Sequence, residues 1–316
     1  MLRILIAPLL VALLALSGCG GGDDVSAGAG GERIRADKAN AGKAITLGSK
    51  GFTESLIVAQ IYGQALTAAG YEVRYDLDFA DEQVATRAMQ SGQIDGYPEY
   101  TGTALTALLG AEPGEIPKDE QQAYELVKRR YAERFGFVAL PQTPFTDSNA
   151  LGMTREKAAE LGNPKTISDL RGKAQKLTLA GSSECFRRMD CALGFERVYG
   201  LRFKRKIRID LSERHEVILQ DKADLTIPFT TDGQIAANDE VILEDDKNLF
   251  PPYNVTFVVT KKKADELGAD LEPTITKVQR GLTTPVMQEL NSRADLDKQP
   301  PARVATDYLR RGGFVR

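Results

Sequence analysis

The chain has 316 residues, of which 42% are hydrophobic and 27% charged, so it carries enough apolar material for one to three domains with buried cores. Its formal net charge is −3, and Lys/Arg and Asp/Glu are mixed along the sequence without a basic stripe, which argues against a nucleic-acid partner. The single histidine, His215, makes a metal site or a Ser-His or Cys-His hydrolase poorly supported, and its charged neighbours indicate a solvated helix residue.

The N-terminal segment predicts export. Residues 1–3 supply one positive charge, and residues 4–17 (ILIAPLLVALLALS) are an apolar core too short and too lightly flanked for a stable transmembrane helix. The sequence LSGC that ends at Cys19 resembles a bacterial lipobox, which implies that Cys19 is the first mature residue and carries lipid. The alternative is a plain secretory signal with a chance cysteine. Either way, the rest of the chain is expected outside the cytoplasm, and with the lipid it is held at the outer face of the cytoplasmic membrane.

Residues 1–18 are therefore assigned to a signal peptide, and residues 19–43, rich in Gly, Ala and charge, to a lipidated flexible tether. From residue 44 onward, short β-rich runs alternate with amphipathic helical runs. The first series has, in chain order, a strand at 44–48, a helix at 53–69, a strand at 71–79, a helix at 81–91, helices from about 101 and from about 118 to 135, and a strand at 137–140.

A second series follows. It has a capping box at 166–169 that opens a short helix, then strands at 176–180, 206–210, 224–228, 241–243 and 254–260, and a mostly helical region from 272 to 310. Repeated βα units predict α/β layers with central, largely parallel sheets, and two series of about a hundred residues each favour two lobes over one large sheet. Ligands of such folds bind at the carboxyl ends of strands or between domains. The sequence contains neither a Gly-x-Gly-x-x-Gly after a strand nor a Gly-Lys-Ser/Thr phosphate loop.

The two cysteines after Cys19 lie close together, in SSECFRRMDCALG. In an exported protein the simplest interpretation of Cys185 and Cys191 is an intrachain disulfide, and two free buried thiols are the alternative. If they join, they close a small loop with Arg188 at its middle.

Five short segments together resemble the substrate-binding proteins of ABC importers for glycine betaine, choline, carnitine and related quaternary amines. They keep the family's order over roughly residues 44–315: GSKGFTES (48–55), QSGQIDGYPEYTGTAL (90–105), ERVYGL (196–201), FTTDGQI (229–235) and LFPPYNVTFVV (249–259). The resemblance implies a type II periplasmic-binding-protein fold: two α/β lobes, a hinge and a ligand cleft between them. Lobe 1 is expected at 44–145 plus 255–316, and lobe 2 at 146–254.

The resemblance also implies a function: capture of a quaternary-amine osmoprotectant and delivery to a membrane permease with its ATPase, by a protein that is not an enzyme, needs no cofactor and acts as a monomer. A quaternary ammonium has no N–H group, so aromatic faces must hold it, each contributing about 0.5–2 kcal/mol. A carboxylate at the other end of the solute needs cationic or hydroxyl donors. Two lobes that close over a small solute can hold both ends at once.

Position by position, the resemblance assigns Lys50, Thr103 and Arg188 to the solute carboxylate and Tyr100 and Tyr253 to the walls of an aromatic box. Each residue has a plainer alternative role. Lys50 could be a solvated loop charge, Thr103 a helix residue, Tyr253 a core aromatic, and the matching arginine could be Arg187.

Two positions depart from the family pattern, which has tyrosine at both. Asn149 replaces an aromatic face with an amide, and Phe229 keeps the face but lacks the hydroxyl. The expected box is therefore Tyr100, Phe229 and Tyr253, with one side opened and made polar by Asn149. The exact solute, and the effect of these two positions on it, are left open.

The remaining residues near the expected cleft have less specific roles. Tyr97 alternates away from Tyr100 and is expected to be packing or pocket rim. Glu54 and Asp147 are acidic and near the expected cleft, where they could help attract a cation, but a place at the surface is expected for both. Three other functions stay open: an extracellular α/β enzyme, an adhesion or interaction lipoprotein, and the same transport role with a different small polar cationic solute.

Overall fold

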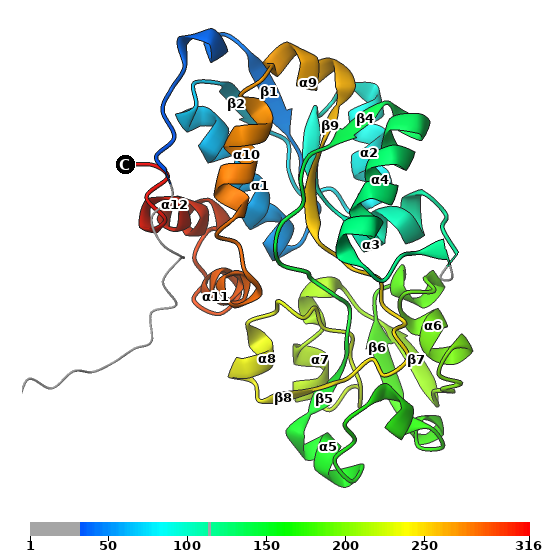
Figure 1. Cartoon of the computed structure of the whole chain (residues 1–316). Coiled ribbons are helices and arrows are strands. Elements are labelled where there is room, and N and C mark those ends of the chain that lie inside the picture. The colour runs from blue at the N-terminus through cyan, green and yellow to red at the C-terminus, as the bar shows by residue number, and fades with distance from the viewer. Residues whose placement is uncertain (1–31, 113–114) are drawn as a thin grey trace, which may run out of the picture.

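The computed structural model describes residues 32–112 and 115–316 (Figure 1). We call the part built on a five-stranded sheet lobe 1 and the part built on two two-stranded sheets lobe 2. The two α/β lobes expected from the sequence are confirmed. The expected signal peptide, the lipidation site at Cys19 and the tether up to residue 31 lie outside the described residues. Among the helices of the described part, none combines the length and the apolarity that crossing a membrane requires.

The sheet of lobe 1 is mixed, whereas the sequence pattern predicted largely parallel sheets. Its strand order is β2-β1-β3-β9-β4, with β1 parallel to β2 and β3, and with β9 antiparallel to β3 and β4. The strands are β1 (Ala44–Leu47), β2 (Glu72–Tyr75), β3 (Gly96–Tyr100), β4 (Phe137–Ala139) and β9 (Val255–Thr260). Because β9 returns directly from lobe 2, it starts beside the end of β3, with Val255 opposite Tyr100, and must run the other way.

Helices cover both faces of this sheet. On one face α1 (Thr53–Ala68) packs against α10 (Leu271–Gln279), α11 (Thr284–Asp295) and α12 (Pro301–Arg311). The other face carries α2 (Glu82–Ser91), α3 (Thr101–Thr103) with the π-helical turn η2 (Ala104–Leu108), and α4 (Glu120–Phe135). A short α9 (Lys261–Leu267) follows β9. Sheets covered on both faces bury strands such as β3, in which every residue is buried.

Lobe 2 holds two pairs of strands. β5 (Leu151–Thr154) pairs antiparallel with β8 (Glu240–Leu243), and β6 (Thr178–Gly181) pairs parallel with β7 (Arg205–Arg208). The strand expected at 224–228 forms only isolated bridges, from Leu225 to Leu179 and from Thr226 to Gly152, which link the two pairs. Short helices surround them: α5 (Arg155–Glu160), α6 (Ala192–Arg197), α7 (Glu216–Leu219) and α8 (Gln234–Ala237). The expected capping box is present, with Thr166 and Asp169 bonded reciprocally at a 3₁₀ turn.

Two segments cross between the lobes and run antiparallel to each other. The backbone N–H of Thr143 donates to the carbonyl of Val255 at 2.8 Å, and that of Asp147 donates to Tyr253 at 3.2 Å. The side chain of Asn254 adds bonds to the carbonyls of Thr143 and Phe145 at 3.1 and 3.2 Å. These two paired segments form the covalent connection between the lobes.

The last residues of the expected tether pack against lobe 1. Ile34 is buried in its core and bonds through its N–H to the carbonyl of Phe314 at 2.9 Å, and the side chain of Asn40 donates to the carbonyl of Ala69 at 3.0 Å. The composition of residues 32–43 did not indicate this packing, because only one isoleucine and one buried amide make the contacts.

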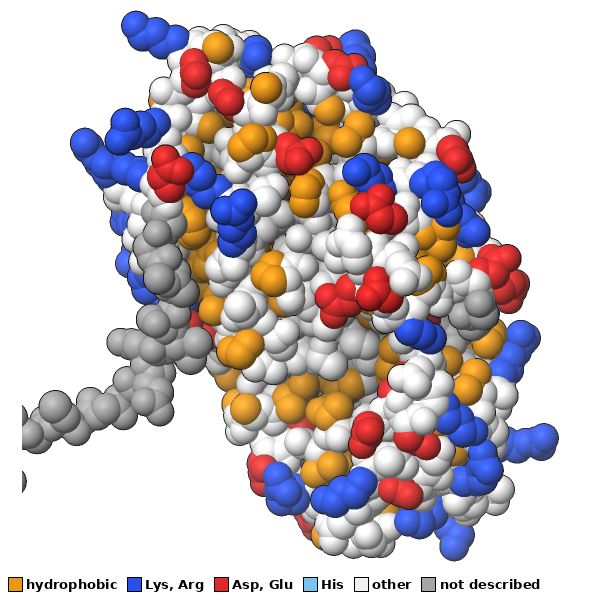
Figure 2. Space-filling model, viewed as in Figure 1, with side chains coloured by type: hydrophobic (Ala, Val, Ile, Leu, Met, Phe, Trp, Pro, Cys, Tyr) orange, Lys and Arg blue, Asp and Glu red, His pale blue; other side chains and the backbone are white. Residues whose placement is uncertain are grey.

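His215 is buried, so the expectation of a solvated helix residue was wrong. Its side-chain nitrogens lie 2.9 Å from Asp232 Oδ2 and 2.8 Å from Glu240 Oε1. Burial lowers the pKa of His215, but the bonds to these two carboxylates outweigh burial and leave the pKa raised. On the face seen in Figure 2, acidic and basic side chains are interspersed over both lobes.

Candidate functional site

A cavity of about 80 Å³ lies between the lobes beside the crossing segments. Because one water needs about 10–15 Å³ of comparable volume, this space accepts a small solute. All seven residues predicted for ligand binding line it, together with eight others: Lys50, Gly51, Phe52, Ala80, Asp81, Glu82, Tyr100, Thr103, Asp147, Asn149, Glu184, Arg188, Leu211, Phe229 and Tyr253. A second cavity of about 60 Å³ adjoins it on the lobe 2 side and shares Asn149, Arg188 and Phe229 among its lining residues.

Aromatic rings from both lobes meet at this cavity. The ring centroid of Phe52 lies 5.6 Å from that of Tyr100 and 5.6 Å from that of Phe229. Tyr253 reaches the cavity from the crossing segment before β9. Its ring packs on α3, where a Cβ on Gly102 would come within 2.6 Å of it, so only glycine fits there. Phe52 was missed in the sequence, although it stands inside the GSKGFTES segment, directly before α1.

Lys50 is buried at the cavity and already has a carboxylate partner. Its Nζ lies 2.8 Å from Glu99 Oε1. The same ammonium lies 4.5 Å from the centroid of the Tyr100 ring and 5.7 Å from that of Phe52. A cation therefore sits over the aromatic rings within the protein itself, in the geometry of a cation–π contact.

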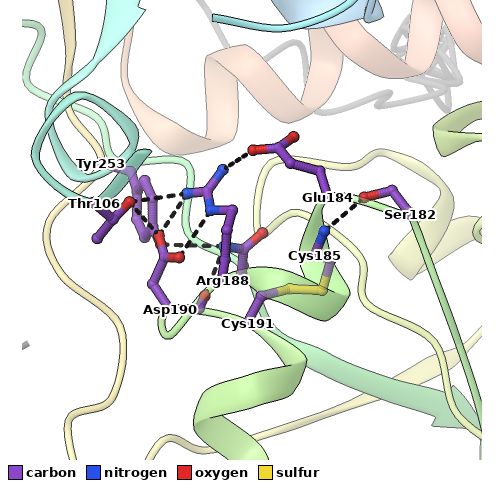
Figure 3. Close-up of a disulfide and its surroundings, with 9 residues drawn as sticks. Thr106, Ser182, Glu184, Cys185, Arg188, Asp190, Cys191 and Tyr253 are labelled. Atoms are coloured by element: carbon purple, nitrogen blue, oxygen red, sulfur yellow. Dashed lines mark hydrogen bonds and ion pairs between the residues drawn. A yellow bond between two sulfur atoms is a disulfide. The ribbon is translucent and has the colours of Figure 1, made fainter. Parts of the chain in front are cut away.

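Arg188 is held by carboxylates on two sides (Figure 3). Its Nε donates to Asp190 Oδ1 at 2.8 Å, and its Nη2 to Asp190 Oδ2 at 2.5 Å; its Nη1 donates to Glu184 Oε1 at 3.0 Å. Nη2 also reaches the hydroxyl of Thr106 in lobe 1 at 3.3 Å. Burial raises the pKa of Asp190, but Arg188 more than offsets burial, and the pKa lies below its usual value. This ion pair therefore links lobe 2 to the turn that follows α3.

The disulfide between Cys185 and Cys191 is confirmed, with the two Cα atoms 5.3 Å apart (Figure 3). Arg188 and Asp190 both lie in the loop that it closes. The backbone N–H of Cys185 donates to Ser182 Oγ at 3.1 Å, which fixes the start of the loop. The crosslink thus restrains the segment that carries the ion pair.

Asn149 connects the ion pair to Tyr253. Its Nδ2 donates to the Tyr253 hydroxyl and to the backbone carbonyl of Asp190, both at 3.1 Å. The Tyr253 hydroxyl in turn donates to Asp190 Oδ2 at 2.5 Å. Both hydrogens of the Asn149 amide are used within the protein, which leaves the amide oxygen as its acceptor toward a solute.

Thr103 and Tyr97 differ in their relation to the cavity. Thr103 lines it, and among the described residues its hydroxyl has no hydrogen-bond partner. Tyr97 is packing, as expected: it lies in the core of lobe 1, and its hydroxyl donates to Glu99 Oε2 at 2.6 Å. By holding Glu99, Tyr97 supports the carboxylate that pairs with Lys50.

Glu54 and Asp147 are buried, so their expected place at the surface was wrong. Glu54 Oε1 accepts from the Tyr100 hydroxyl at 2.9 Å, and Asp147 Oδ1 accepts from the Thr231 hydroxyl at 2.7 Å. Burial raises the pKa of both carboxyls, and their mutual repulsion adds to the shift of Asp147. Their burial could not be predicted from the sequence, because the neighbours that bury them are far apart in the chain.

Glu82, one of the acids that line the cavity, was also missed. Burial raises its pKa to about 8, against the opposing effect of Lys50. Within the described residues, no group of three or more His, Cys, Asp or Glu side chains has the arrangement of a metal site. The cavity thus combines aromatic faces, paired cations and buried carboxyls, an arrangement for holding a small charged solute.

Comparison with known proteins supports the family resemblance found in the sequence. Residues 43–311 match the family described as the substrate-binding domain of ABC-type glycine betaine transport systems. A glycine-betaine-binding protein of Pseudomonas aeruginosa is 32% identical over 84% of this chain and 87% of its own length. The carnitine transport binding protein OpuCC of Listeria monocytogenes is 28% identical over 85% of this chain and 87% of its own length.

A solved structure described as a glycine betaine/carnitine/choline ABC transporter superposes with a TM-score of 0.69 at 26% identity, over 84% of this chain and 97% of its own. The family is a transport component and not an enzyme, so the enzyme and adhesion alternatives fall away. The chain belongs to the family of substrate-binding domains of ABC-type glycine betaine transport systems.

Proposed function

We propose that this chain captures a quaternary-amine osmoprotectant between its lobes and delivers it to the permease of an ABC importer. The observation that carries the proposal is the cluster of Tyr100, Phe52 and Phe229 rings at the interlobe cavity, with Tyr253 on a further side. Aromatic faces attract a quaternary ammonium that hydrogen bonds cannot hold. The names of the relatives, glycine betaine and carnitine among them, support the same solute class.

In this proposal the ammonium of the solute lies against Tyr100, Phe229 and Tyr253, with Phe52 as an added face. Thr103 offers a hydroxyl, and Asn149 its amide oxygen, to the polar end of the solute. Lys50 and Arg188 are the cations nearest to that end. Since both have carboxylate partners, they act on a solute carboxylate only by sharing or exchanging those partners.

We also infer a place in the cell from the signal-like and lipobox-like segment at residues 1–19. Cleavage before Cys19 and lipidation of that residue would anchor the chain at the outer face of the cytoplasmic membrane, where several acyl chains bind stably. Residues 19–31 would then tether two lobes that act as a monomer and dock onto the permease, whose ATPase lies on the other side. Metabolic labelling with a radioactive fatty acid, abolished in Cys19→Ala, tests the anchor.

Isothermal titration calorimetry with glycine betaine, choline, carnitine, proline betaine and ergothioneine tests the solute class. Each solute is paired with its non-quaternary analogue where one exists, such as glycine for glycine betaine. We expect saturable heat with at least one quaternary amine and none with its unmethylated analogue. If no solute of the panel gives heat, the quaternary-amine assignment fails.

A further inference from the structure

Glu82, the first residue of α2, is a cavity residue whose role the preceding sections leave open. Its side chain is only 3% exposed and lines the interlobe cavity. Its Oε1 is fully buried and has no hydrogen-bond partner in the described part of the chain. Leaving a buried polar group unpaired destabilises the fold, and more so when the group is charged. A buried acid of this kind at a binding cavity points to a partner that the protein itself does not supply.

The side chains that line the cavity around Glu82 include more acids than bases. The lining carries four carboxyl groups, Asp81, Glu82, Asp147 and Glu184, against the two cations Lys50 and Arg188. Each cation has carboxylate partners of its own: Lys50 bonds Glu99, and Arg188 bonds Glu184 and Asp190. No cation of the lining is therefore dedicated to Glu82, or to a carboxylate that a solute would bring.

The titration of Glu82 reflects the same imbalance. Burial raises its pKa to about 8, Lys50 and Arg188 oppose the shift, and Glu184 and Glu99 add to it. Asp81 flanks it at the cap of α2, bonded to the N–H of Val84 at 2.7 Å. A positive charge brought next to Glu82 would favour its ionised form and release its proton.

We propose that Glu82 contacts the solute as a carboxylate and makes the cavity select a solute of net positive charge, with a hydroxyl or similar donor, over its zwitterionic carboxylate analogue. This inference rests on the proposed function and sharpens it. The ammonium lies on the aromatic faces, and the donor at the other end reaches Glu82. A solute carboxylate in that place would face Glu82 and Glu184 across the cavity.

Choline and glycine betaine test the inference, because they share the trimethylammonium group and differ in hydroxyl against carboxylate. Calorimetric titrations of the purified protein are run between pH 6 and 9, in pairs of buffers with different ionisation enthalpies. We expect choline to bind at least tenfold more tightly than glycine betaine at pH 8. We also expect choline affinity to rise with pH up to about 8, with release of a proton below that pH, as linkage requires for an acid that ionises on binding.

The variant Glu82→Gln should bind choline at least tenfold more weakly, lose the proton release and leave glycine betaine affinity within about threefold. Glu133→Gln is the matched control, since Glu133 is exposed on α4 outside the cavity, and it should behave as wild type. A preference for glycine betaine that weakens as pH rises would mean that Glu82 donates a proton to a carboxylate, and would overturn the inference. So would binding that is indifferent to Glu82→Gln. The wild-type pH profile decides the matter if the variant does not fold, whereas absence of binding by any quaternary amine defeats the proposed function itself.

Discussion

The ring of Tyr100 faces the cavity, and its hydroxyl points to the buried carboxyl group of Glu54. The ring lies under the Lys50 ammonium at 4.5 Å, and the hydroxyl donates to Glu54 Oε1 at 2.9 Å. Phe keeps the ring and removes only the hydroxyl, whereas Leu removes the face that attracts a cation. We expect Tyr100→Phe to retain solute affinity within about threefold and Tyr100→Leu to lose about tenfold, as one cation–π contact of about 1.4 kcal/mol implies.

The comparison is made by calorimetry with whichever quaternary amine binds best. Tyr131→Leu is the control, because Tyr131 is a buried tyrosine of lobe 1 outside the cavity lining. It should lower the melting temperature without changing affinity. Equal affinities for Tyr100→Leu and Tyr100→Phe would remove Tyr100 from the box.

Asp232 supplies a second test at the scale of single residues. Its carboxylate accepts from Arg214 Nε at 2.7 Å and from the N–H of Phe229 at 2.8 Å, and it lies 2.9 Å from His215 Nε2. Burial raises the pKa of Asp232, but Arg214 and His215 outweigh burial and lower it to about 2. A depressed folded-state pKa stabilises the protein above the unfolded value of about 3.9, and this stabilisation is lost as pH falls toward 2.

Urea unfolding followed by circular dichroism should therefore show that wild type exceeds Asp232→Asn in free energy of unfolding at pH 6, and that the difference shrinks by about 2 kcal/mol between pH 5 and pH 2. Glu54, Asp147 and His215 titrate in both proteins, but the charge of Asp232 raises the pKa of all three, so the difference reports Asp232 together with its effect on these neighbours. A gap between the two proteins that stays constant over this range would show that Asp232 keeps its ordinary pKa in the fold.

The residues that line the cavity could be predicted from the sequence, but the residues that bond to them could not. All seven predicted ligand residues line the cavity, and five of them stand in the short segments that carry the family resemblance. The partners Glu99 of Lys50 and Asp190 of Tyr253 become visible only in the fold, since the pairs lie 49 and 63 residues apart. Burial of Glu54, Asp147 and His215 was missed for the same reason: it depends on residues brought together by tertiary packing.

At the scale of elements, helices were predicted more closely than strands. Observed α1, α2 and α4 lie within two residues of the expected bounds, because their apolar spacing and the glycines at residues 92 and 136 mark them. The strand β5 was missed, and the expectation of largely parallel sheets did not include the antiparallel β9, since strand pairing depends on distant segments. The alternation of apolar and polar residues in one strand does not show which other strand pairs with it, or in which direction.

At the scale of elements, we predict the effect of removing the disulfide that closes the loop from Cys185 to Cys191. Cys185 and Cys191 are six residues apart, and a loop this short contributes only about 2 kcal/mol in the chain-entropy model. We expect the double variant Cys185→Ser/Cys191→Ser to lower the melting temperature by only about 5 °C but to weaken solute binding about tenfold, because the Arg188–Asp190 pair is no longer held in place.

Differential scanning calorimetry and titration calorimetry measure the two effects. The control is Arg187→Gln, which changes the neighbouring arginine, for which no ion pair is found among the described residues. It should leave both quantities near wild type. A large fall in melting temperature with unchanged affinity would make the crosslink a purely structural one.

Contacts between α11 and lobe 2, which lie side by side in Figure 1, add a further link between the two lobes. The amide of Asn291 donates to Glu54 Oε2 in lobe 1 and to the carbonyl of Thr231 in lobe 2, both at 3.0 Å. Gln288 adds a bond to the carbonyl of Thr230 at 3.0 Å, and Gly233 has no Cβ, which lets the backbone at Ser292 approach. One buried amide thus joins both lobes next to the cavity.

If solute binding requires the lobes to be closed, weakening this contact reduces the population that can bind, and the apparent affinity falls in proportion. Asn291→Ala removes both bonds and leaves Glu54 with fewer donors. At about 1 kcal/mol for a lost hydrogen bond, we expect affinity to fall about 5- to 10-fold and the radius of gyration without solute to increase in small-angle X-ray scattering.

Gln279→Ala is the control, since Gln279 is an equally buried amide that bonds Tyr62 within lobe 1 alone. It should destabilise the protein without opening it, whereas an unchanged radius and affinity in Asn291→Ala would show that closure does not depend on α11.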